Sequence, residues 1–288
     1  MRELSLEELK IVQFHILKAF AEYCDAHQLR YYIVAGTLLG AVRHGGFIPW
    51  DDDIDVSMPR PDYEKLLEVS GGWISDVYRV TSVKNCKEHS RLFMKVVDTR
   101  TMAKHYFYSE RYKMSIGIDI FPLDGVPADE NVRKRYFKKL WFTKKLFSYT
   151  QTQLMRGGTK LRALIKTLAA VPSRMIGRER LYRMVERQAA KYPFDQCEEI
   201  GINFGVYKEK ETVKKEEYLP YHDLSFEGVM FHAPANYDAY LQQLYGDYMQ
   251  LPPMEARQPH HPYTVWWEGE EFPEDILLHH DMEMEKAE

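Results

Sequence analysis

The stretch FIPWDDDIDV, residues 47–56, crowds four aspartates among apolar side chains. In a strand, alternate side chains point to opposite faces, so Asp53 and Asp55 would share one face while Ile54 and Val56 enter the core. Two neighbouring carboxylates repel each other, and a divalent cation between them removes that repulsion. Magnesium takes oxygen ligands and typically joins one or two protein carboxylates to a phosphate. The pair therefore predicts a metal site for phosphate chemistry.

A third carboxylate is expected in such a site, to complete the metal shell or to accept the proton of an attacking hydroxyl. Asp119 is the first candidate. In the stretch MSIGIDIF the isoleucines alternate and must face the core, so Asp119 faces the other way, beside the small Gly117. Asp98 and Asp124 are weaker competitors.

Donors for phosphate oxygens precede the aspartates in the sequence. Gly36 and Thr37 stand between a predicted strand and a short helix, where free N–H groups and a hydroxyl bind phosphate well. Arg43 and His44 end that helix, and Arg43 either grips a phosphate in a bidentate fork or is a surface cation at the helix C-terminus. Lys95, within FMKVV, either points into the site or reaches solvent from an edge strand.

The elements that must position these residues follow from periodicity and capping. Ser5 to Glu8 has the form of a capping box. Helices are predicted at 5–26, from Thr37 to His44, at 61–70, through most of 131–191 and within 233–253; strands are predicted at 29–36, 53–58, 78–83, 91–100 and 114–121. Pro122 should end the last strand, Gly157-Gly158 and Pro172 should break the long helical region, and the chain should turn irregular after Pro252 and end in an acidic tail.

The composition is that of a folded protein. The 288 residues are 45% hydrophobic and 28% charged, enough for one large core or two small ones. Three distant cysteines without a CxxC pair disfavour a zinc knuckle and fit a reducing compartment. No signal peptide and no run of about 18 apolar residues are visible, so a cytoplasmic protein is expected.

Charge is unevenly distributed along the chain. Residues 131–191 hold 17 lysines and arginines against two acids, Glu179 and Glu186, whereas the remainder carries an excess of acids. The lysines and aromatic residues of FKKLWFTKKLF are typical of a helix that lies on an anionic membrane surface. Alternatively, the basic segment binds the acidic body of its own chain.

Three blocks together resemble the LicD family, whose relatives include the fukutin-type transferases. They are AGTLLGAVRHGGFIPWDDDIDVSMPRPDYEKL, IGIDIFPLDG and FEGVMFHAPANYDAYLQQLYGDYMQLPP. The resemblance implies an α+β fold of nucleotidyltransferase type, a small mixed sheet flanked by helices. Residues 1–130 would form the catalytic core, 131–200 a basic helical segment, and 201–288 a part that completes the catalytic unit.

The resemblance also implies the reaction. Family members transfer phosphocholine or a polyol phosphate from a CDP-linked donor to a glycan or lipid-linked acceptor. Carried over, the metal-binding acids fall on Asp53, Asp55 and Asp119, with Mg²⁺ as the expected cation and Mn²⁺ as a substitute. Gly36, Thr37, Arg43, His44 and Lys95 would contact the substrates, and one carboxylate, for which Asp119 is favoured, would accept the hydroxyl proton.

Several alternatives remain open. The same acids suit a nucleotidyltransferase that uses a nucleoside triphosphate and releases pyrophosphate. The basic segment suits a nucleic-acid-binding protein, although the acidic half that carries the site disfavours it. Asp51 and Asp52 either join the metal site or form a solvated acidic turn. The transferred alcohol cannot be identified, because no residue can be assigned to its pocket.

Overall fold

The computed structural model describes residues 2–105, 114–151, 160–259, 263–268 and 272. Its centre is a seven-stranded mixed sheet in the order β2-β3-β7-β5-β4, with β8 paired to β7 and β9 paired to β8. The strands are β2 (Tyr32–Ile33), β3 (Asp55–Pro59), β4 (Tyr78–Thr81), β5 (Met94–Asp98), β7 (Gly117–Val126), β8 (Glu199–Ile202) and β9 (Thr212–Lys214). Only β3 and β7 run parallel among these pairs.

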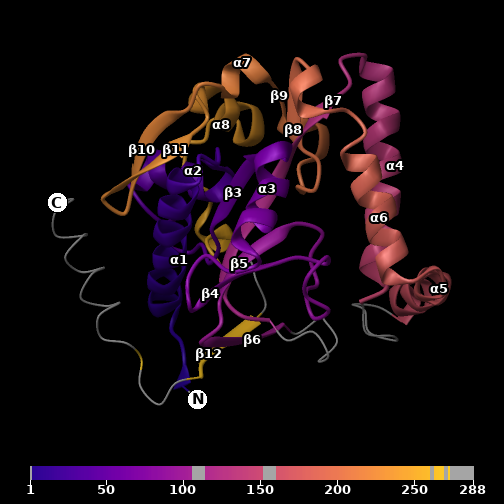
Figure 1. The fold of residues 1–288 in the computed structure, drawn as a ribbon, viewed down its shortest axis with the longest axis horizontal. Helices are drawn as coiled ribbons and strands as arrows, with labels where there is room; N and C mark the ends of the chain where they lie inside the picture. Colours follow the sequence, from indigo (N-terminus) through magenta and orange to yellow (C-terminus); the bar gives the residue numbers. More distant parts are fainter. Residues whose placement is uncertain (1, 106–113, 152–159, 260–262, 269–271, 273–288) are drawn as a thin grey trace.

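Helices cover this sheet, as Figure 1 shows, so the predicted α+β fold of nucleotidyltransferase type is confirmed. The sheet-covering helices are α1 (Leu6–Ala26), α2 (Ala35–His44), α3 (Arg60–Ser70) and α8 (Tyr237–Tyr245). The capping box of α1 is present: the hydroxyl of Ser5 accepts from the N–H of Glu8, and the Glu8 carboxylate accepts from the N–H of Ser5. Helix α8 lies within the predicted range; Asn236 caps it and Gly246 follows its end.

Helices α4 (Glu130–Tyr149), α5 (Lys160–Ile176) and α6 (Arg178–Ala189) stand together along one side of the molecule and form the helical arm (Figure 1). The arm has a hydrophobic core of its own, which includes Phe137, Phe147 and Val185. A buried ion network ties it to the sheet. Arg60 donates from Nε and Nη2 to the Asp124 carboxylate at 2.7 and 2.6 Å, and its Nη1 lies 3.3 Å from Glu186 on α6.

Two smaller sheets complete the fold. Strands β1 (Arg2–Glu3), β12 (Tyr263–Trp267) and β6 (Thr101–His105) form one, and β10 (His222–Phe226) and β11 (Val229–Ala233) form a hairpin. The remaining short elements are η1 (Phe194–Gln196), η2 (Lys208–Glu211), α7 (Lys215–Tyr218) and η3 (Met254–Ala256). The prediction of irregular structure after Pro252 is therefore wrong at β12, which lies between the N-terminal strand and β6.

The strand β7 runs through Pro122, which was expected to end it. The N–H of Asp119 donates to Ile54 on the β3 side, so the missing N–H of Pro122 belongs to the opposite edge. On that edge the pairing with β5 stops at Ile120, and the pairing with β8 begins at Leu123. Proline is tolerated because it occupies the place where β7 changes partners.

Other boundaries also differ from the predictions. Strand β2 has only two residues, because the chain already turns into α2 at Ala35, and β5 stops at Asp98 instead of reaching Arg100. Pro172 lies inside α5 and does not break it. The Gly157-Gly158 break and the acidic tail after 272 lie outside the described residues.

Candidate active site

A cavity of about 1140 Å³ opens where β3 and β7 meet α2. Its walls come from α2 and the segment 48–55, from β7 and the loop after β8, and from the segment 245–257. Most of the predicted site residues reach it, namely Gly36, Arg43, Asp53, Asp55 and Asp119. Segments far apart in the sequence thus meet at one hollow beside the parallel pair of strands.

The pairing of the two parallel strands sets the central acids. Asp55 on β3 is in register with Asp119 on β7, and the N–H of Asp119 donates to the carbonyl of Ile54 at 2.9 Å. Asp53 comes before β3, so the prediction that it shares a strand face with Asp55 is wrong. Both residues nevertheless line the cavity. Ligand oxygens of Asp53, Asp51 and Asp52 can lie within 4.8 Å of one another.

The acids share a poorly solvated space, and this changes their proton affinity. Burial, together with Asp53 and Asp119, raises the pKa of Asp55 well above its usual range. Burial and the neighbouring aspartates raise the pKa of Asp51 to about 7. Burial also raises the pKa of Glu211, on the opposite wall, to about 8. Negative charge at these positions is unfavourable until a cation joins it.

The donor set fits a hard divalent cation such as Mg²⁺, because it consists of carboxylate oxygens. Gly36 supports this arrangement. A Cβ atom at position 36 would lie 2.7 Å from Oδ2 of Asp51, so the absence of a side chain lets that carboxylate approach the start of α2. Asp51 therefore belongs to the cavity wall and not to a solvated turn, and its side chain is buried.

Lys95 is the partner of Asp119. Its ammonium nitrogen lies 2.6 Å from Oδ1 of Asp119, and strands β5 and β7 place the two residues opposite each other. Lys95 itself does not line the cavity. A cation bound by Asp119 has to use the other carboxylate oxygen or displace the lysine. The ion pair therefore disfavours a site in which Asp53, Asp55 and Asp119 all bind the cation freely.

Thr37 lies beneath the cavity wall. Its hydroxyl accepts from the N–H of Asp55 at 2.8 Å, and its side chain is buried and does not line the cavity. In this arrangement Thr37 positions the start of β3. Its predicted contact with phosphate stays a prediction.

The cationic wall of the cavity is made by arginines. Arg43 donates from Nη1 to the carbonyl of Tyr248 at 2.8 Å, and Arg257 stacks over Trp50 with its guanidinium carbon 5.4 Å from the ring centre. Burial and the neighbouring Arg257 lower the pKa of Arg43. His44 is exposed and does not line the cavity. Two adjacent arginines at one end of an acidic cavity suit a ligand with several phosphate oxygens.

Sequence reasoning missed several residues of the cavity, among them Glu211 and Arg257. Glu211 and Arg257 lie far from the aspartate cluster along the chain, in polar segments without a motif. Nothing in their spacing could have identified them. The weaker candidates Asp98 and Asp124 are absent from the cavity lining: Arg100 pairs with Asp98 at 2.7 Å, and Arg60 pairs with Asp124 at 2.6 Å.

Comparisons with known proteins agree with this fold. The family model "LicD/FKTN/FKRP, nucleotidyltransferase domain" matches residues 28–156. The lipopolysaccharide cholinephosphotransferase LicD of Haemophilus influenzae is 32% identical over 273 residues, which cover 91% of this chain and 97% of the relative. The mouse and human ribitol 5-phosphate transferases FKRP are 40% identical over 47 residues, 16% of this chain and 10% of theirs.

The similarity to the Haemophilus protein extends over nearly the whole of both chains. The matched family segment contains α2 with Gly36, β3 with Asp55 and β7 with Asp119, as well as Asp53 just before β3. The chain therefore belongs to the LicD family of transferases.

Proposed function

We propose that the protein transfers a phospho-alcohol group, phosphocholine or a polyol phosphate, from a CDP-linked donor to a hydroxyl of a cell-surface glycan or lipid-linked saccharide. The observation that carries the proposal is a single cavity with an acidic floor and an arginine wall. It has the charge pattern for a cation-bound diphosphate. Among the relatives, one is a cholinephosphotransferase and two are ribitol 5-phosphate transferases.

The residues take the following roles in this proposal. Asp53, Asp55 and Asp119, with Asp51 beside them, would hold Mg²⁺ or Mn²⁺, which neutralises charge that develops on the phosphate oxygens. Arg43 and Arg257 bind the donor's diphosphate from the side of α2. Gly36 leaves room for Asp51 against the helix start.

The transfer itself is an in-line displacement at the distal phosphorus of the donor. The acceptor oxygen forms a bond to that phosphorus, the bond to the bridging oxygen breaks, and CMP leaves with the electron pair. The proton of the acceptor hydroxyl passes to a carboxylate, for which we propose Asp119. Lys95, 2.6 Å from this carboxylate, keeps it oriented.

A donor screen tests the proposed reaction. CDP-choline, CDP-ribitol and CDP-glycerol are each offered with Mg²⁺, and CMP release is measured beside pyrophosphate release from CTP. We expect CMP from at least one CDP-alcohol. Pyrophosphate from CTP without CMP from any of the three would instead establish the nucleotidyltransferase alternative.

The variant Asp53→Asn tests the site. It should lower CMP release by at least about 10³-fold, because an amide is a poorer ligand for a hard cation and leaves the charge of the diphosphate uncompensated. The matched control is Asp76→Asn, an exposed acid outside the cavity. Circular dichroism should show the same fold in both variants, and unchanged turnover in Asp53→Asn would overturn the assignment.

We also propose that the helical arm attaches the enzyme peripherally to the inner face of an anionic membrane. Leu168, Val171 and Met175 of α5 are exposed apolar residues. Beside them, a groove between α4 and α6 is lined by cationic side chains, namely Lys139, Arg180, Arg183, Arg187 and Lys191. Exposed apolar residues next to clustered positive charge suit an anionic lipid surface. None of the described helices is long and apolar enough to span a bilayer.

Flotation with vesicles of phosphatidylcholine, alone or with phosphatidylglycerol, tests the attachment. The protein should float only with the anionic vesicles, and the double variant Leu168→Ser with Met175→Ser should weaken flotation. Equal behaviour with both vesicles would contradict the proposal, as would salt-sensitive binding of labelled RNA with no vesicle binding, which would indicate a nucleic-acid surface.

A further inference from the structure

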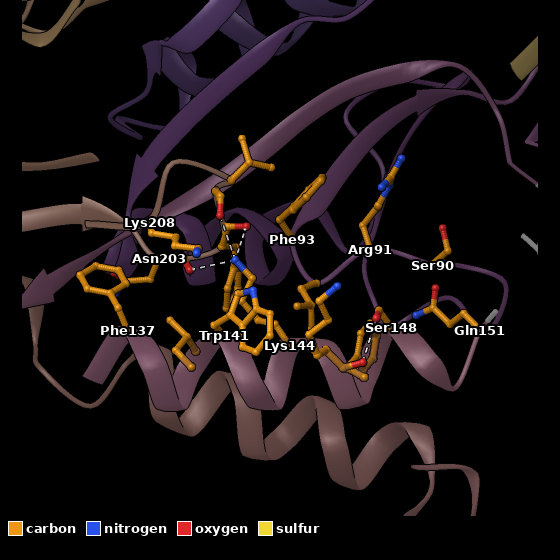
Figure 2. A pocket seen from close by; sticks show the side chains of 17 residues that line it. Ser90, Arg91, Phe93, Phe137, Trp141, Lys144, Ser148, Gln151, Asn203 and Lys208 are labelled. Carbon is orange, nitrogen blue, oxygen red and sulfur yellow. Dashed lines mark hydrogen bonds between the residues drawn. The ribbon is translucent and has the colours of Figure 1, made fainter. Parts of the chain in front are cut away.

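A second cavity, of about 350 Å³, adjoins the active site on the side of the helical arm. It lies between α4, the segment 90–93 and the loop 203–208. Figure 2 shows Trp141, Lys144 and Ser148 on α4, with Phe93 and Arg91 on the opposite side. The two cavities share a wall, which consists of Arg91, Phe93, Phe204, Gly205 and Val206. We call this second cavity the arm pocket.

Aromatic rings dominate the arm pocket: Phe93, Phe137, Trp141, Phe147 and Phe204 line it. Trp141 is 45% exposed, so its ring offers a face to a ligand. Flat aromatic faces with a few polar groups among them are the usual lining of small-molecule sites. The C–H faces of sugar rings stack on such surfaces.

Two buried amides of the arm pocket each have one atom without a hydrogen-bond partner in the described part of the chain. Among the residues that the structure describes, Nε2 of Gln151 and Oδ1 of Asn203 have no hydrogen-bond partner, and the two side chains are 1% and 2% exposed. An unsatisfied buried polar group costs about 1–3 kcal/mol. The wall of the arm pocket is therefore polar beneath its aromatic surface, which suits a ligand that carries hydroxyl groups as well as apolar faces.

The charges of the arm pocket are all positive among its described lining residues. Arg91, Lys144, Lys145 and Lys208 line it, and no aspartate or glutamate does. Lys144 is engaged in the fold, since its ammonium donates to the carbonyls of Asn203, Phe204 and Gly205 at 3.3, 2.8 and 2.9 Å. Lys145 and Lys208 flank the ring of Trp141, at 5.6 and 5.9 Å from its centre. The rim therefore favours an anionic ligand and disfavours the cation of choline.

We propose that the arm pocket is the acceptor subsite and binds an anionic saccharide, a sugar residue that carries a phosphate or a carboxylate. The inference rests on the proposed function and gives its acceptor a place and a chemical class. The arginines Arg43 and Arg257, which suit the donor, line the active site but not the arm pocket. In Figure 1, β3 lies between α2 and α4, so donor and acceptor would approach the central acids from different sides.

Direct binding tests this assignment without relying on turnover. Saturation-transfer NMR with glucose 6-phosphate, glucose, inorganic phosphate and CMP compares wild type with Trp141→Ala. The matched control is Trp73→Ala, since Trp73 is 44% exposed and likewise lies beside a cation, Arg79, but lines neither cavity. Glucose 6-phosphate should bind, about 10-fold more weakly to Trp141→Ala, and Trp73→Ala should match wild type.

Each other outcome overturns the proposal. Equal binding of glucose 6-phosphate by both tryptophan variants places the sugar elsewhere. Inorganic phosphate that binds as tightly as the sugar phosphate indicates a simple anion site. Loss of CMP binding in Trp141→Ala assigns the pocket to the donor's base. Lys208→Gln is a second variant that keeps the aromatic wall, and it should weaken the sugar phosphate but not uncharged glucose.

A turnover experiment separates this inference from the proposed reaction. With water as the acceptor, CMP release by the control Trp73→Ala should equal that of wild type, because Trp73 lines neither cavity. With a phosphorylated oligosaccharide acceptor, the KM for the acceptor should rise about 10-fold in Trp141→Ala, in line with the loss of one stacking contact, and stay unchanged in Trp73→Ala. If no CDP-alcohol yields CMP, the proposed function fails, whereas the NMR result still decides whether the pocket binds an anionic saccharide.

Discussion

The active site and the arm pocket share one wall but have opposite charges. Carboxylates of the sheet and of η2 dominate the first, and lysines and rings of α4 dominate the second. The polar groups of the two cavities also differ in their surroundings. The acids raise each other's pKa values, whereas in the arm pocket one atom of each of two buried amides has no hydrogen-bond partner among the described residues. The contrast indicates two ligands of different kinds, one that brings a cation and one that brings negative charge and hydroxyl groups.

The variant Asp55→Asn should have the largest effect. It tests whether the acids of the active site are required for turnover and whether they repel one another. Turnover should fall by at least about 10³-fold, because one of the acids proposed to hold the cation is lost. Without divalent cations, the thermal unfolding temperature should stay equal or rise, since the pKa of Asp55 is raised by burial and by Asp53. A large drop in that temperature would show that the acids stabilise each other, contrary to the electrostatic argument.

Two variants, one in each cavity, test whether the donor and the acceptor bind in different places. Arg43→Gln should raise the KM for the CDP-linked donor about 10²-fold through the loss of a charged phosphate contact, and should leave glucose 6-phosphate binding unchanged. Lys208→Gln should do the reverse. Equal effects of each variant on both ligands would mean that the two cavities act as one site.

The shared wall depends on Lys144. In Lys144→Met the carbonyls of Asn203, Phe204 and Gly205 lose their donor, so the free energy of unfolding should fall by about 2 kcal/mol. Amide exchange should accelerate in residues 203–206. Lys138→Met, an exposed change on the same helix, is the control and should leave both measurements unaltered. A loop that exchanges normally in Lys144→Met would show that the wall is held by other contacts.

A smaller, pH-dependent effect is expected from Glu211. Burial raises its pKa from 4.5 to about 8, so between these values the folded protein holds a proton that the unfolded chain has released. The stability from this carboxyl is complete below pH 4.5 and is lost as the pH rises through 8. From pH 6 to 7 the loss is at most about 1.4 kcal/mol, measured by urea unfolding without divalent cations.

The control for this pH effect is built into the same segment. Glu211→Gln should flatten the decline, whereas Glu216→Gln, at a largely exposed side chain, should leave it as in wild type. Added Mg²⁺ should reduce the decline if the cation binds beside the ionised acids. A decline of the same slope in Glu211→Gln would assign it to other groups.

The sequence predicted best where local chemistry decides. The capping box at Ser5 and the alternation that turns Asp119 away from the isoleucines are local signals, and the structure has both. Prediction failed where distant partners decide. Pro122 continues a strand only because β7 exchanges β5 for β8 at that point, and no local rule contains that exchange.

The site shows the same division. Gly36, Arg43, Asp53, Asp55 and Asp119 line the cavity, whereas Lys95 pairs with Asp119 and the Thr37 hydroxyl accepts from the N–H of Asp55. Glu211 and Arg257 enter the cavity through tertiary packing alone, from segments that read as ordinary polar surface. Only the fold brings them beside the aspartates.

The ion network of Arg60 bears on how the helical arm can change in evolution. Arg60 starts a core helix, yet it pairs with Asp124 of the sheet and reaches Glu186 of the arm. A related chain that had lost the arm would leave this guanidinium without one of its acidic neighbours, near the surface newly uncovered. We therefore expect arginine at this position to be inherited together with the arm, so that residue 60 would mark, in an alignment, which relatives carry the extra helices.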